Sequence, residues 1–97
     1  MDPLTASARL HGLEIVYTNS RRVLLAAGHR KCRPVIRAHR CFRGCSQQVA
    51  EAVVSLFCGN TGVNPRRVVL GYVRGQLSDV RDPRINLPGQ RMARLGE

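Results

Sequence analysis

Aromatic and acidic residues are scarce in this chain. It has no tryptophan, two tyrosines, two phenylalanines and six acidic residues, against 16 lysines and arginines. So few aromatic rings argue against a surface that binds nucleic acid by stacking on successive bases. We also find no run near the ~18 apolar residues of a membrane span and no secretion signal. We therefore expect a cytoplasmic protein with reduced cysteines and no membrane partner.

The basic residues are concentrated in one part of the sequence. The formal net charge is +10, and residues 15–50 contain no acid at all. The planar guanidinium of arginine donates two parallel hydrogen bonds to a phosphate. We therefore predict a polyanion ligand, most simply the nucleic-acid backbone without sequence specificity, with a merely solvated face as the alternative. The predicted phosphate-binding residues are Arg21, Arg22, Arg30, Lys31, Arg33, Arg37, Arg40 and Arg43.

With 97 residues, the chain has room for one domain. The composition predicts an irregular N-terminal segment over residues 1–12, a single α+β domain over 13–77 and a polar, flexible tail over 78–97. A domain of that size is marginally stable alone and often depends on a partner or a second copy.

Three stretches have the pattern of strands. Residues 13–18 alternate apolar and polar side chains, and the Asn19-Ser20 turn predicts a hairpin with a second strand over 23–27. Residues 28–32 make the next reversal, and 35–40 form a third strand with Ile36 and Ala38 toward the core.

Two helices are expected after the strands. Ser46 is a good N-cap, apolar residues then follow helical spacing, and Gly59 ends the helix. Asn64-Pro65 starts the second helix. The order β-β-β-α-α predicts a small antiparallel sheet with both helices packed on one face.

Three short motifs resemble the N-terminal part of SprT-like zinc metallopeptidase domains. They are Asn19–Leu25 (NSRRVLL), Ile36–Phe42 (IRAHRCF) and Val49–Val53 (VAEAV). The resemblance implies the non-catalytic half of that domain: a truncated relative, a fragment or a reused scaffold. The family's H-E-x-x-H zinc helix is missing, and the only histidines are His11, His29 and His39. We therefore expect no catalytic residue, no metal, no cofactor and no enzymatic activity.

The thiols leave several interpretations open. Cys32, Cys41 and Cys45 lie close in sequence to His29 and His39, and Cys58 follows later, but no spacing matches a paired C-x-x-C zinc site. We interpret Cys41, Cys45 and Cys58 as small apolar core residues, with structural zinc or redox use as alternatives. A nucleophilic Cys41 assisted by His39 lacks a third group. We therefore predict that His39 bonds to the backbone at the end of its strand.

The predicted sheet also leaves an open edge. Such edges pair with other chains. A homodimer or a larger protein partner docked at this edge is therefore the alternative to polyanion binding.

Overall fold

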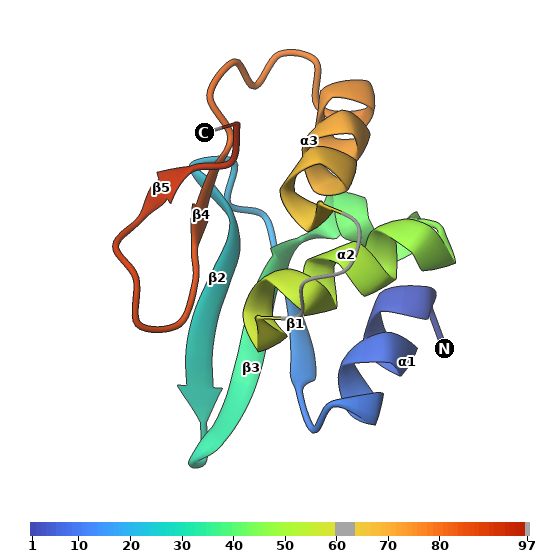
Figure 1. The fold of residues 1–97 in the computed structure, drawn as a ribbon, viewed down its shortest axis with the longest axis vertical. Coiled ribbons are helices and arrows are strands. Elements are labelled where there is room, and N and C mark those ends of the chain that lie inside the picture. Colours follow the sequence, from blue (N-terminus) through green and yellow to red (C-terminus); the bar gives the residue numbers. More distant parts are fainter. Residues whose placement is uncertain (60–63, 97) are drawn as a thin grey trace.

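The computed structural model describes residues 1–59 and 64–96. Its α+β architecture confirms the predicted fold class: helices pack against one mixed, five-stranded sheet in the order β1-β3-β2-β4-β5 (Figure 1). None of the described helices is long and apolar enough to cross a membrane. The strands are β1 (Glu14–Thr18), β2 (Val23–Arg30), β3 (Arg33–His39), β4 (Arg84–Asn86) and β5 (Ala93–Arg94).

The first two strands do not form the predicted hairpin. β1 pairs in parallel with β3, and β3 separates it from β2. The hairpin joins β2 and β3, with Leu25 opposite Ala38 and Arg30 opposite Arg33. The predicted antiparallel sheet is therefore corrected to a mixed one. Apolar alternation shows which face of a strand is buried, but it does not identify the neighbouring strand.

The β2–β3 turn consists of Lys31 and Cys32 only, so the predicted reversal over 28–32 is too long. Both residues have positive φ, 51° and 64°. Two-residue hairpin turns of this kind usually contain Asn-Gly or Asp-Gly, because most side chains are strained in the left-handed region. This turn is therefore built from unfavourable residues.

The N-terminal segment is helical, so the prediction of an irregular segment over residues 1–12 is wrong. Helix α1 (Pro3–Leu10) begins at Asp2, whose carboxylate accepts from the backbone N–H of Thr5 at 3.0 Å. Leu4 and Ala8 are completely buried. The Tyr17 hydroxyl donates to Asp2 at 2.6 Å and so ties β1 to the start of this helix.

The two predicted helices are present. In α2 (Gln47–Cys58), the Ser46 hydroxyl accepts from the N–H of Val49 at 3.3 Å, and Gly59 ends the helix with a φ of 70°. Helix α3 (Pro65–Gln76) starts after Asn64, and Val69 and Val73 bury its apolar face. Both helices contribute to the same core as the sheet.

The segment expected to be a flexible polar tail completes the sheet. β4 pairs in parallel with β2, and β5 pairs with β4. Ile85, Leu87 and Leu95 are buried. Such short strands have no readable periodicity, which is why the sequence did not reveal them.

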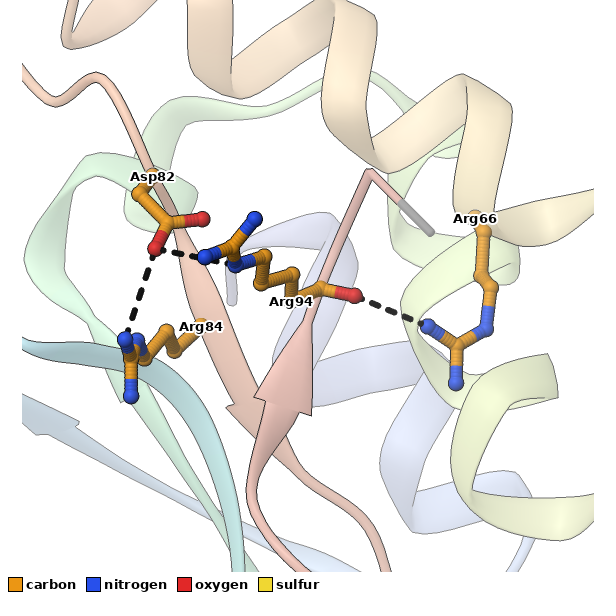
Figure 2. A network of polar contacts seen from close by, with 4 residues as sticks. All are labelled: Arg66, Asp82, Arg84 and Arg94. Carbon is orange, nitrogen blue, oxygen red and sulfur yellow. Dashed lines mark hydrogen bonds and ion pairs between the residues drawn. The ribbon is translucent and has the colours of Figure 1, made fainter.

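Polar contacts hold this last segment in place (Figure 2). Asp82 accepts a hydrogen bond from Arg84 at 3.5 Å and forms an ion pair with Arg94 at 3.4 Å. The guanidinium of Arg66 on α3 donates to the backbone carbonyl of Arg94 at 3.4 Å. β5 is thereby linked to α3 as well as to β4.

Candidate anion-binding site

The eight predicted basic residues divide between the two ends of β3, and all eight are exposed. One group, the turn cluster, consists of Arg30, Lys31 and Arg33 at the β2–β3 turn. The other, the η1 cluster, consists of Arg21 and Arg22 after β1 with Arg40 and Arg43 on the short 3-10 helix η1 (Arg40–Gly44). Arg37 lies on β3 between them. Residues 34–39 of β3 lie between Arg33 and Arg40 and separate the clusters by about 20 Å.

In the turn cluster, two arginines face each other without an acid between them. The register places Arg30 directly opposite Arg33, and like charges in such cross-strand pairs are destabilising. A guanidinium nitrogen of Arg33 lies 3.9 Å from the Glu14 carboxylate, which offsets part of this repulsion.

Arg37 lies on the same face of the sheet as Arg33, since alternate residues of a strand share a face. Its side chain passes over Gly28 on β2: a Cβ at Gly28 would lie 3.3 Å from Arg37 Nε. Glycine at this position leaves room for the guanidinium to lie against the sheet. The path between the two clusters is therefore also basic.

Three residues of the η1 cluster, Arg21, Arg40 and Arg43, line a cavity of about 440 Å³ at the ends of β1 and β3. Four chain segments form it: the loop after β1, the last residue of β3, η1 and the end of α3. The polar side chains come from the first three. The lining residues are Asn19, Arg21, His39, Arg40, Cys41, Arg43 and Leu77. No carboxylate lines this cavity.

The buried His39 ring has a fixed orientation. Its Nδ1 accepts a hydrogen bond from the backbone N–H of Cys41 at 3.1 Å, which confirms the predicted bond to the backbone. Burial lowers the pKa of His39, and the nearby Arg40 and Arg21 lower it further. The ring is therefore neutral near pH 7, with its proton on Nε2. Nε2 has no hydrogen-bond partner among the described residues, and no buried side-chain nitrogen or oxygen lacks one, so Nε2 is accessible to solvent.

The backbone of η1 is anchored in the core. Phe42 is completely buried, and its ring centroid lies 5.6 Å from that of Tyr72 on α3. The Tyr72 hydroxyl donates to the carbonyl of Cys41 at 2.5 Å. Arg40 and Arg43 therefore project from a positioned backbone.

Few of the predicted residues are neutralised. Arg21 pairs with Asp79, and Arg33 lies near Glu14. The other six form no ion pair with any residue in the described ranges 1–59 and 64–96. Asp82 pairs instead with Arg84 and Arg94. The predicted charge is therefore largely available to a ligand.

The Cys41 thiol does not contact His39 in the way that the nucleophile hypothesis requires. The backbone N–H of Cys41, rather than its thiol, contacts His39. Burial, with a smaller effect from Cys45, raises the pKa of the Cys41 thiol to about 11, so this thiol is protonated at neutral pH. Cys45 lies in the core as predicted.

Cys58, in contrast, is exposed at the end of α2, so the prediction that it is a core residue is wrong. Cys32 is exposed in the β2–β3 turn. Within the described ranges, no three His, Cys, Asp or Glu side chains are grouped so that they could hold a metal ion.

The sequence did not identify Asn19 and His39 as lining residues of the basic cavity. The signal was their position at the carboxyl ends of two strands, but it becomes readable only when β1 and β3 are known to be parallel neighbours. Ligands often bind at such converging strand ends. The sequence pattern predicted a β1–β2 hairpin instead, and therefore did not bring these two strand ends together.

Comparisons with protein-family models, with curated proteins and with solved structures find no match. The resemblance to SprT-like domains therefore stays a prediction.

Proposed function

We propose that this protein is a non-catalytic, cytoplasmic domain that binds a polyanion, most simply the backbone of a nucleic acid without regard to base sequence. The observation that carries the proposal is six exposed cations without an acidic partner among the described residues, distributed over both ends and the middle of β3. One strand of duplex DNA carries a phosphate every ~3.4 Å, so the ~20 Å between the clusters spans about six phosphates.

The aromatic residues support recognition of the backbone rather than the bases. The Phe42 ring is buried against Tyr72, and Tyr72 itself is hydrogen-bonded to Cys41. The Tyr17 hydroxyl is bonded to Asp2. These rings are committed to packing, whereas non-specific stacking on single strands needs exposed rings. Phosphate contacts fix the position of a protein on nucleic acid but carry no direct sequence information.

The test is a salt titration of binding to two duplexes of unrelated sequence. We expect equal affinities for both and a logarithmic salt slope no steeper than about −5, because about six cations release counterions at ~0.9 per phosphate. Unequal affinities or a flat salt dependence would contradict backbone binding.

Charge-matched variants locate the interface. Arg30→Gln/Arg33→Gln and Arg40→Gln/Arg43→Gln should each weaken binding and reduce the slope by about two. Arg67→Gln/Arg74→Gln removes the same charge from exposed positions on α3 and serves as the control. Equal losses in all three variants would indicate attraction by net charge alone.

A second candidate function is self-association or docking of a protein partner at the edge of β1. β3 is the only strand paired with β1 in the described part of the chain, so its other edge is unpaired. Sedimentation at several protein concentrations tests this: an unchanged monomer mass up to high concentration would exclude a homodimer.

A further inference from the structure

The η1 cluster differs from the turn cluster in that three of its four charges converge on one cavity. Arg21 reaches it from the loop after β1, and Arg40 and Arg43 reach it from η1. None of the turn-cluster residues lines this cavity. A cavity of about 440 Å³ falls within the usual range of small-ligand sites.

The lining contains several hydrogen-bond donors of the kind that phosphate needs, and no carboxylate. Each guanidinium presents a planar fork that matches two phosphate oxygens. Nε2 of His39 adds a neutral N–H whose orientation is fixed, because Nδ1 already accepts from Cys41. The amide of Asn19 supplies a further donor group.

We infer that this cavity binds one phosphate group carried as a monoester, either at the end of a nucleic-acid strand or on a small phosphorylated molecule. This inference deepens the proposed function and rests on it, since it assigns one cluster of the same basic surface to a particular phosphate. The site consists of Asn19, Arg21, His39, Arg40 and Arg43.

A monoester fits this site better than a backbone diester for two reasons. It carries a charge of about −1.5 to −2 at pH 7 and presents three strong acceptor oxygens. An internal diester carries a single negative charge and has two of its oxygens bonded to sugars, so it cannot occupy all the donors from three segments at once. A backbone running across the protein also has no free end to enter a cavity, whereas a terminal phosphate has one.

Arg21 already has an ion-pair partner, so its guanidinium must be shared between Asp79 and the phosphate. It pairs with Asp79, but Asp79 does not line the cavity. The guanidinium has five N–H donors, so it can keep this pair and still donate toward a phosphate. Asp79 therefore pairs with Arg21 without contributing a carboxylate to the lining of the cavity.

The experiment compares two single-stranded oligonucleotides of identical sequence, one with a 5′-phosphate and one with a 5′-hydroxyl, by fluorescence anisotropy at fixed salt. One additional charge-assisted hydrogen bond corresponds to about a 10-fold preference for the phosphorylated strand. Arg40→Gln/Arg43→Gln should abolish the preference. Arg30→Gln/Arg33→Gln should weaken both strands equally and leave the preference intact. Unchanged thermal unfolding of both variants shows that they are folded.

Calorimetry with inorganic phosphate and with a nucleoside 5′-monophosphate distinguishes the two sources of the monoester. If either small probe binds, and Arg40→Gln/Arg43→Gln abolishes that binding, the result supports a site for a free phosphorylated molecule. This holds even if the two oligonucleotides bind equally. Equal oligonucleotide affinities without binding of either small probe overturn the inference and leave the proposed function standing. Failure of both oligonucleotides to bind at low salt overturns the proposed function.

Discussion

The two ends of β3 carry similar charge, but the backbone that carries it is held very differently at each end. At the η1 end, Arg40 and Arg43 flank the buried Phe42, and Tyr72 and His39 both bond to the backbone of Cys41. At the turn end, Arg30 faces Arg33 across an exposed two-residue turn with positive φ at both positions. A ligand group is held in one geometry only where the donors are themselves held. The η1 end is therefore suited to a defined contact, and the turn end to long-range attraction.

The largest expected effect is a loss of stability when the buried ring that anchors the η1 end is removed. Phe42→Ala should lower the free energy of unfolding by about 3–5 kcal/mol, because a completely buried aromatic ring is replaced by a cavity. Urea denaturation measures the change. Leu10→Ala removes an apolar side chain that is 85% exposed and should change stability little. A loss below about 1 kcal/mol for Phe42→Ala would show that η1 is not anchored as described.

The next largest expected effect is a gain of stability when the residues of the β2–β3 turn are replaced. Lys31→Asn/Cys32→Gly should raise the free energy of unfolding by about 1–2 kcal/mol, because Asn-Gly adopts this turn without the left-handed strain of Lys-Cys. Thermal unfolding under matched salt measures the gain. Lys31→Gln, which removes the charge and keeps the strained backbone, should not reproduce it. If Lys31→Gln gives the same gain, charge repulsion rather than backbone strain is the cause.

A smaller expected effect tests whether the Tyr72–Cys41 hydrogen bond contributes to binding as well as to stability. Tyr72→Phe removes the hydroxyl that donates to Cys41 and should cost about 1 kcal/mol. It should also weaken binding of the 5′-phosphorylated strand, because η1 is less firmly held. Tyr17→Phe removes the corresponding bond to Asp2, away from the cavity, and is the matched control. Equal binding losses in both variants would contradict a local role for Tyr72.

The finest test is the pH dependence at His39. Its pKa in the folded protein is lowered from 6.5 by burial and by Arg40 and Arg21. The unfolded chain therefore takes up the proton first. The neutral His39 ring of the folded protein therefore contributes its full stabilisation above about pH 6.5. This stabilisation is lost as the pH falls toward the pKa of His39 in the folded protein. Stability measured from pH 8 to 5 should show this decline, and His39→Asn should reduce it. His29→Asn, which replaces an exposed histidine on β2, is the matched control variant. An identical decline in His39→Asn would assign it to other groups.

Local signals in the sequence predicted the local structure well. Ser46, Gly59 and the apolar spacing between them predicted α2, and the pattern around Asn64-Pro65 predicted α3. At the N-terminus, Asp2 followed by Pro3 is an equally good helix start, but the mixed composition up to Gly12 concealed it.

Non-local pairing could not be predicted in the same way. The ranges 13–18 and 23–27 were predicted to be strands, and the observed strands are Glu14–Thr18 and Val23–Arg30, yet the alternation of each fits several neighbours. Only the structure shows β3 between them, and this placement divides the basic residues into two clusters instead of one face. The basic residues themselves were readable from the sequence. Their convergence on a cavity was not, because it depends on the parallel pairing of β1 with β3.

The pairing of β2 with β4 also has a consequence for how the chain reaches this structure. Leu25 and Ile85 are neighbours across the sheet although they are 60 positions apart in the chain. Closing so long a loop is entropically costly and slows folding relative to local hairpins. Until residues 84–86 arrive, β2 presents an unpaired edge beside its apolar side chains. During refolding, this transient edge is where one molecule would pair with another and aggregate.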